Sequence, residues 1–274
     1  MLRERIVTAA ALAALLLGSL LSGEQILFSL LLAVFVNLAA WEWAYLAGCR
    51  QVKSGILYSI LVTLSLPLLY FSIPTPWIIW VILLGAIWWC MAAVMVLCYQ
   101  AGGQPIPASR TACYLLGYFV FLPAWIGLVS LYPHRQGPQL LLLFFGMIWL
   151  VDSAAFFAGR RWGKRKLANR VSPGKSWEGF IAGMLVSLLP ALAFIVYANV
   201  SGRAGLGLMV LCIVSSVFSV MGDLFISMFK RHADVKDSSR LLPGHGGVLD
   251  RIDSITAAAP VFVSGIWMLE GKLS

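Results

Sequence analysis

Ionisable side chains are concentrated in one stretch of this sequence, residues 227–253. Eleven of its 27 residues carry an ionisable side chain, whereas Asp, Glu, Lys and Arg make up only 11% of the whole chain. Apolar segments flank the stretch on both sides. Polar groups beside hydrocarbon are costly unless they bind a partner, so this pattern indicates a functional site. Its carboxylates, cations and glycines are groups that bind phosphate and a metal ion.

A polar stripe leads into this stretch. Asp223, Ser227, Lys230 and Arg231 recur at i, i+4, i+7 and i+8, a spacing that puts them on one face of a helix. That face carries one carboxylate, one hydroxyl and two cations. Apolar residues occupy the other faces, so we expect this helix to leave the membrane here.

A glycine loop and a pair of carboxylates follow the stripe. The glycines of residues 243–247 permit the close approach that a phosphate-binding loop requires. Asp250 and Asp253 lie three residues apart, on one face at the start of the next helix. Such carboxylates repel each other unless they share a cation, and oxygen ligands suit Mg²⁺. The simpler alternative is that they only complement the helix dipole and pair with Arg251 or Lys236.

A second basic loop, residues 159–177, carries seven Lys and Arg residues. Pro173-Gly174 predicts a turn, and Ser176 is a candidate N-cap for the helix that follows. A helix N-terminus with Lys175 beside it offers amide donors and positive charge to an anion. The simpler alternative is a basic hinge that only reflects the tendency of cytoplasmic loops to retain Lys and Arg.

The tripeptide Gly174-Lys175-Ser176 matches part of a P-loop. That motif needs a glycine at position 169, where this sequence has asparagine, and a strand before the loop, which we do not expect here. Phosphate binding is therefore kept as a hypothesis and the P-loop is rejected. Asp152 lies in the apolar run before this loop, where a carboxylate needs a cation or a donor to be tolerated. It is a further candidate for the site.

Composition predicts an all-α, polytopic membrane helix bundle. Hydrophobic residues make up 61% of the 274 residues, and the apolar runs are too long and too uniform for the strands of a membrane barrel. A crossing helix takes roughly 20 residues, so about nine fit. The expected spans are 5–22, 26–46, 55–73, 75–98, 111–132, 138–158, 178–199, 204–228 and 252–270. We expect the first to be retained, because its apolar core is longer than that of a typical signal peptide.

The basic residues predict how the bundle is oriented. With the N-terminus in the cytoplasm, 17 Lys and Arg residues fall on the inner side and three on the outer side. The net charge of +9 then belongs to one face, which is expected to attract membrane lipids and phosphorylated ligands, and no nucleic acid. We expect two parts: about five N-terminal transmembrane helices in 1–137, and a catalytic transmembrane region in 138–274 with cytoplasmic loops 159–177 and 229–251.

Residues 227–253 resemble the signature of phosphatidate cytidylyltransferases, also called CDP-diacylglycerol synthases. The matching positions are Ser227, Lys230-Arg231, Lys236-Asp237, Pro243, His245-Gly246-Gly247 and Asp250-Arg251-Ile252-Asp253. The similarity extends to residues 172–179, 152–155 and 41–43. It implies a multi-pass enzyme of the bacterial inner membrane. Such an enzyme uses Mg²⁺ to make CDP-diacylglycerol and pyrophosphate from CTP and phosphatidate on the cytoplasmic side.

The resemblance also suggests roles for individual residues. Asp223 and Asp250 are expected to hold the metal. The expected catalytic group, which offsets phosphate charge or orients the reactants, is Lys230, Arg231, Lys236, His245 and Asp253. The expected substrate-binding residues are Asp152, Ser172, Lys175, Ser227, Arg251 and, through their backbone amides, Gly246 and Gly247. His245 is expected to position phosphate rather than to act as a base, because the attacking phosphate is already ionised near neutral pH.

Two other functions stay open. In a secondary transporter, Glu42, Asp152 and Asp223 would form an ion path, but such sites lie near the membrane midplane and these charges gather at helix ends. Another lipid-phosphate transferase, such as a CDP-alcohol phosphotransferase, would carry a D-G…A-R…G…D…D pattern, which is absent from this sequence. Glu42 has no part in the expected mechanism, and it either bonds a neighbouring helix or stabilises the fold. A homodimer is neither required nor excluded by the sequence.

Overall fold

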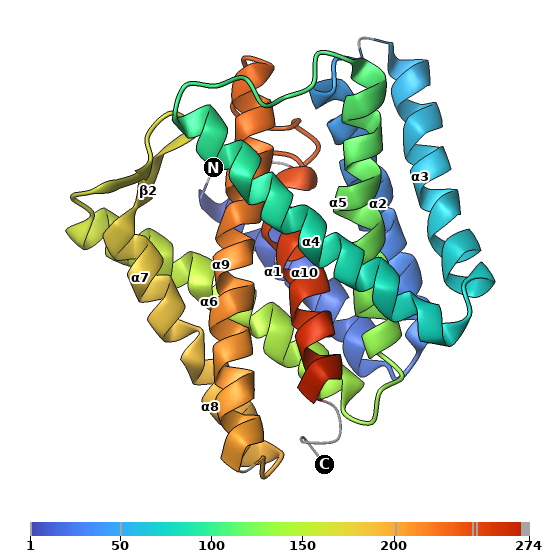
Figure 1. The fold of residues 1–274 in the computed structure, drawn as a ribbon, viewed down its shortest axis with the longest axis vertical. Helices are drawn as coiled ribbons and strands as arrows, with labels where there is room; N and C mark the ends of the chain where they lie inside the picture. The colour runs from blue at the N-terminus through green and yellow to red at the C-terminus, as the bar shows by residue number, and fades with distance from the viewer. Residues whose placement is uncertain (1, 50, 201, 243, 245, 270–274) are drawn as a thin grey trace.

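The computed structural model describes residues 2–49, 51–200, 202–242, 244 and 246–269. Over these ranges the chain forms a bundle of helices with one small hairpin at its side (Figure 1). The helices are α1 (Leu2–Leu21), α2 (Gln25–Leu46), α3 (Val52–Ser72), α4 (Thr75–Gln100), α5 (Arg110–Leu131), α6 (Gly137–Trp162), α7 (Trp177–Val186), α8 (Leu188–Tyr197), α9 (Gly202–His232) and α10 (Leu249–Leu269). The strands are β1 (Lys166–Ala168) and β2 (Ser172–Ser176). The predicted all-α membrane bundle is confirmed, with the hairpin as an addition.

Each of the nine expected spans corresponds to one helix or to one pair of helices. In the described part of the chain, eight segments are long and apolar enough to cross a membrane: α2 to α6, the α7–α8 pair, α9 and α10. Helix α1 contains a shorter apolar stretch, Ala10–Leu21. The seventh span is interrupted at Ser187, between α7 and α8. Pro190 lies just after the interruption and has no N–H to donate to the carbonyl of Val186.

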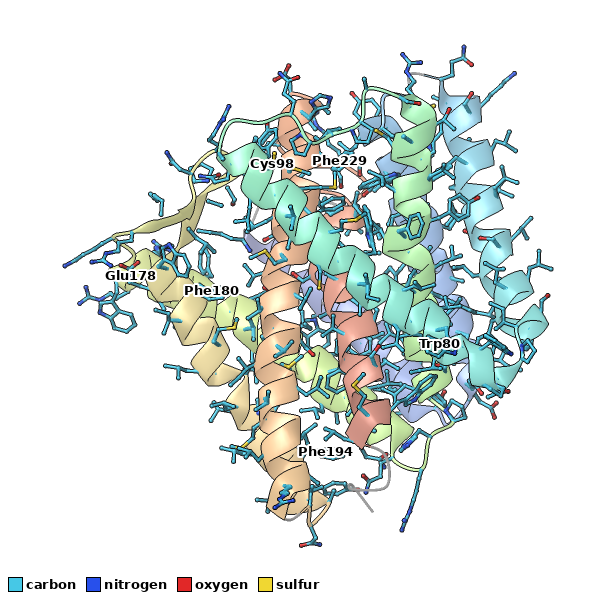
Figure 2. The ribbon with its side chains drawn as sticks, viewed as in Figure 1. Trp80, Cys98, Glu178, Phe180, Phe194 and Phe229 are labelled. Atoms are coloured by element: carbon cyan, nitrogen blue, oxygen red, sulfur yellow. The ribbon has the colours of Figure 1, made fainter. Side chains whose placement is uncertain are left out.

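The outward faces of the bundle are apolar. On α4, the side chains of Trp77, Trp80 and Leu84 are each more than half exposed, and Figure 2 shows Trp80 on the outer part of this helix. The same helix buries Trp89 completely. A surface of large exposed apolar side chains suits lipid rather than water. The protein therefore has the surface of a multi-pass membrane protein.

The connections between helices alternate between the two ends of the bundle. Those after α2, α4 and α9 lie together at the top of Figure 1, and those after α5 and α8 lie toward the bottom. The loop that follows α9, residues 233–248, is part of the charged stretch of the sequence. The Lys and Arg pattern assigns this end to the cytoplasm, and that orientation stays a prediction.

An aromatic cluster fixes α2 against α9 near the charged end. Trp43 is fully buried, and its ring centroid lies 4.6 Å from that of Phe229. Its indole N–H donates to the carbonyl of Cys113 at 2.9 Å. Figure 2 shows Phe229 close to the upper end of α9. Because Glu42 precedes Trp43 and Lys230 follows Phe229, this packing positions two charged residues of the site.

Helices α9 and α10 approach each other closely at Gly222. A Cβ atom at this position would collide with the carbonyl oxygen of Asp253 and would lie 2.7 Å from the Cβ of Ala257. Glycine therefore lets the two backbones touch. This contact brings Asp223 on α9 beside the carboxylates at the start of α10.

We expect Gly222→Ala to force α9 and α10 apart, because overpacking a tight interface costs about 1–3 kcal/mol. Both the unfolding midpoint in detergent and the activity should fall. Gly146→Ala on α6 is the matched control, since a Cβ atom there meets nothing within 4 Å and alanine is the better helix former. Equal unfolding midpoints for the two variants would show that the close approach is dispensable.

The hairpin corrects two details of the sequence analysis. The predicted turn at Pro173-Gly174 is wrong, because the turn lies at residues 169–171 and both residues belong to β2. A two-stranded hairpin leaves each strand with a free edge, where proline and glycine are tolerated. A strand does precede Lys175, contrary to expectation, but β1 pairs antiparallel with β2. The P-loop glycine is still replaced by Asn169, so the P-loop stays rejected.

The helix after the hairpin begins as the sequence predicts. Ser176 is the N-cap of α7, and its Oγ accepts the backbone N–H of Gly179 at 3.2 Å. Glu178, at the base of the hairpin in Figure 2, accepts the backbone N–H groups of Lys164 and Arg165 at 3.0 and 3.2 Å. The start of α7 therefore holds the hairpin in place, and with it the basic residues that the hairpin carries.

Candidate active site

The polar face of α9 orients its carboxylate as the helical spacing predicts. Ser227 Oγ donates to Asp223 Oδ1 at 3.1 Å. Two turns after Asp223, the side chain of Lys230 is buried, and its Nζ lies 2.5 Å from Asp250 Oδ1 on α10. Lys230 therefore pairs with a carboxylate across the interface between α9 and α10.

Asp250 accepts hydrogen bonds at both of its oxygens. Oδ1 faces Lys230, while Oδ2 accepts the backbone N–H of Ser238 at 2.9 Å, the hydroxyl of Ser238 at 3.0 Å and the backbone N–H of Gly247 at 3.1 Å. A carboxylate held by one cation and three donors has a fixed orientation. The loop between α9 and α10 is thus folded around this side chain.

The hairpin contributes a second lysine to the site. Lys175 Nζ lies 2.6 Å from Asp223 Oδ2, and the two side chains are 24% and 29% exposed. Burial is the largest single effect and lowers the pKa of Lys175, but the carboxylates of Asp223, Asp152 and Asp253 together raise that pKa above its ordinary value. Lys175 therefore stays cationic at neutral pH. The structure brings together the two charged loops that the sequence analysis singled out.

Two cavities meet at the start of α10. The first, which we call the polar cavity, has a volume of about 550 Å³ and lies among α6, the hairpin, α9 and α10. The second, the apolar cavity, has a volume of about 460 Å³ and lies among α1, α2, α5, α6 and α10. Four residues line both: Asp152, Asp250, Arg251 and Asp253. A ligand with a charged end and a long apolar part fits such an arrangement.

The polar cavity is rich in both signs of charge. Its acidic lining residues are Asp152, Asp223, Asp237, Asp250 and Asp253. Its basic lining residues are Arg160, Lys175, Lys230 and Arg251. Carboxylates of this kind bind a hard cation, and the basic groups complement phosphate oxygens.

The carboxylates of the polar cavity fit Mg²⁺ better than a metal that needs an all-protein cage. Among the described residues, no group of three or more His, Cys, Asp or Glu side chains is arranged to hold a metal ion. Mg²⁺ is usually bound through one or two carboxylates together with substrate phosphates and water. Asp223 and Asp250 both line the polar cavity and supply two such carboxylates. Each carboxylate has about four lone-pair sites. Asp223 accepts from Lys175 and Ser227 and keeps capacity for a further ligand, whereas Asp250 would have to exchange one of its four observed donors for the ion.

Six of the expected site residues line neither cavity, and their roles in binding or catalysis stay predictions. They are Ser172, Ser227, Arg231, Lys236, Gly246 and Gly247. Arg231 instead donates to the carbonyls of Val171 and Val235 at 3.2 and 3.3 Å, and so ties the end of α9 to the hairpin turn. The expected role of His245 falls outside the described residues.

The glycine loop packs against protein rather than enclosing an open space. Gly246 has a φ of +80°, a conformation that favours glycine. At Gly247, a Cβ atom would collide with Ser238 Oγ and would lie 2.5 Å from Glu42 Oε2. Close approach is therefore what this glycine provides, as predicted, but its observed partners are Ser238 and Glu42.

The structure identifies the partners of Glu42, which the sequence alone leaves open. It is fully buried on α2 and accepts hydrogen bonds from the loop between α9 and α10 and from the start of α10. The signal that could have found it is a carboxylate within an apolar span, which must be satisfied by some partner. The partner lies about 200 residues away in the sequence, so spacing alone does not identify it.

The sequence is also similar to those of known proteins. The sequence profile of the cytidylyltransferase family matches residues 3–269. A phosphatidate cytidylyltransferase of Pseudomonas aeruginosa is 42% identical over 267 residues, which cover 97% of each chain. The enzyme of the same name from Haemophilus influenzae is 37% identical, with coverage of 96% of this chain and 97% of the relative. One from Staphylococcus saprophyticus is 42% identical over 137 residues, about half of each chain.

Proposed function

This chain belongs to the cytidylyltransferase family, and we propose that it transfers the cytidylyl group of CTP to phosphatidate. The products are CDP-diacylglycerol and pyrophosphate. It is thus a membrane nucleotidyltransferase of phospholipid synthesis. The family match favours this function over a transporter or a CDP-alcohol phosphotransferase.

One observation carries the proposal: a charged cavity and an apolar cavity share a wall at the start of α10. The shared residues are Asp152, Asp250, Arg251 and Asp253. Phosphatidate has a phosphate and two acyl chains. Its phosphate would lie at this wall, and its acyl chains would extend toward the apolar cavity. CTP would place its triphosphate in the polar cavity, where the lysines lie. The reacting phosphates of the two substrates would then meet at Asp250.

The reaction needs charge compensation and alignment more than it needs a base. An oxygen of the phosphatidate phosphate attacks the α-phosphorus of CTP, and the bond from that phosphorus to the bridging β-phosphate oxygen breaks. Pyrophosphate leaves with the electron pair of that bond. Lys175, Lys230 and Arg251 offset the negative charge of the phosphates that come together. The attacking oxygen is ionised near neutral pH, so no residue has to remove a proton from it.

Mg²⁺ is part of the proposal. Asp223 and Asp250 would hold it, with Asp253 as a supporting carboxylate on the same wall. When bound, the ion neutralises charge on the triphosphate and orients it. With the ion bound, Lys175 and Lys230 would be free to face phosphate oxygens.

We also propose where the reaction takes place. The active site faces the cytoplasm of a bacterial cell, at the inner membrane, because the basic loops belong to the end that the Lys and Arg pattern assigns to the inner side. CTP would enter from that side and phosphatidate laterally from the membrane. A homodimer is compatible with the mechanism, although all the residues named in it come from one chain.

The proposed acceptor can be tested with CTP that carries a radioactive α-phosphate. Purified protein in mixed micelles should move the label into an organic-soluble lipid when phosphatidate is supplied. Diacylglycerol of the same acyl composition is the matched control, because it lacks the attacking phosphate oxygen. Label in lipid with diacylglycerol, or none with phosphatidate, would contradict the proposal.

A further inference from the structure

Glu42 accepts four hydrogen bonds from residues that follow α9. Its Oε1 accepts the hydroxyl of Ser239 at 2.5 Å and the backbone N–H of Val248 at 3.0 Å. Its Oε2 accepts the hydroxyl of Ser238 at 2.8 Å and the backbone N–H of Leu249 at 2.7 Å. A carboxylate accepts at both oxygens and donates at neither, so it matches this set of four donors.

These four donors all precede Asp250 in the sequence, and one of them also contacts it. Val248 and Leu249 directly precede it, and their N–H groups lie at the N-terminus of α10, where no helical carbonyl is available to accept them. The single hydroxyl proton of Ser238 is shared between Glu42 and Asp250, which lie 2.8 and 3.0 Å from its Oγ. A negative charge at a helix N-terminus is also favourable. Glu42 therefore caps α10 from a different helix and shares a donor with the carboxylate of the site.

We infer that Glu42 is a positioning residue, which holds the loop at 238–249 so that Asp250 faces both cavities. The aromatic packing of Trp43 against Phe229 fixes α2 to α9, so the carboxylate has a rigid base. Gly247 lets the loop approach it, since any side chain there would meet Glu42 or Ser238. The catalytic consequence rests on the proposed function, whereas the holding of the loop does not.

Glu42→Gln tests the inference with little change in side-chain volume. The amide replaces one acceptor by a donor, which then faces a hydroxyl and a backbone N–H that also donate. We expect kcat to fall about 10–100-fold, the size of effect found when a group that orients a ligand is removed. The KM for CTP should change much less, because the polar cavity keeps its lysines. A loosened loop should also be cut faster by trypsin after Arg240, which is exposed in this loop.

Two further variants keep the test decisive. Ser239→Ala removes one of the four hydrogen bonds, so it should shift kcat and the rate of cleavage after Arg240 in the same direction by less, and it serves if Glu42→Gln does not fold. Asn37→Ala is the control on the same helix, because Asn37 bonds Thr63 on α3 at 2.9 Å and should leave both readouts at wild-type values.

Two results would overturn the inference. One is wild-type kcat and unchanged cleavage after Arg240 in Glu42→Gln or Ser239→Ala. The other is a Glu42→Gln protein that only has a lower unfolding temperature, with wild-type kcat for its folded fraction, as a purely structural residue would give. If the wild-type protein transfers no cytidylyl group, the proposed function fails, and the tryptic readout still decides whether Glu42 holds the loop.

Discussion

Asp250→Asn should lower cytidylyl transfer by at least about 100-fold, because it removes a charge from the place where the two substrates are proposed to meet. Asp250 lines both cavities and accepts from Lys230, Ser238 and Gly247. The asparagine amide has nearly the same shape, but its NH₂ group must face either Lys230 or three other donors. A metal ligand would also be lost.

The matched control for this variant is Asp234→Asn. Asp234 is exposed, lines neither cavity, and has a φ of +54°, a conformation that asparagine adopts readily. Initial rates over a range of Mg²⁺ concentrations, together with thermal unfolding, measure the effect. Near-normal rates for Asp250→Asn at every Mg²⁺ concentration would remove Asp250 from the proposed metal site.

Lys230→Met should have the largest effect on stability. The pair it forms with Asp250 is 2.5 Å long, and the two side chains are 9% and 6% exposed. Removing one partner of a buried pair leaves an uncompensated charge and costs about 3–5 kcal/mol. The unfolding midpoint in detergent should fall on the order of 10 °C, and activity should be lost as well.

The double variant Lys230→Met with Asp250→Asn separates stability from chemistry. It removes both charges, so it should unfold at a higher temperature than Lys230→Met alone and should remain inactive. Recovery of the unfolding midpoint without recovery of activity is the expected result. A double variant no more stable than Lys230→Met would indicate that the buried charge is not what destabilises the single variant.

The spans and the polar face of α9 could be predicted because they depend on local sequence. Apolar runs of about 20 residues have few alternatives to a crossing helix. The contact between Ser227 and Asp223 follows from i, i+4 geometry, and the N-cap at Ser176 follows from residue type and position. Each of these needs only neighbours within one or two turns of helix.

The partners of the charged residues could not be predicted from spacing. Arg231 shares a face with Asp223, yet its guanidinium reaches the hairpin, because the end of α9 passes beside residue 171. The hairpin itself is built from a short stretch rich in Pro, Gly and basic residues, which gives a weak strand signal. Glu42 meets a loop about 200 residues later. All three depend on how helices distant in sequence pack together.

The release of pyrophosphate from CTP by the purified protein in detergent micelles shows whether transfer needs both the lipid and the metal. It should be measured with and without phosphatidate, and with Mg²⁺ or EDTA. We expect release only when phosphatidate and Mg²⁺ are both present. Release without the lipid, undiminished release in EDTA, or no release from folded protein would contradict a metal-dependent transfer to phosphatidate at the wall shared by the two cavities.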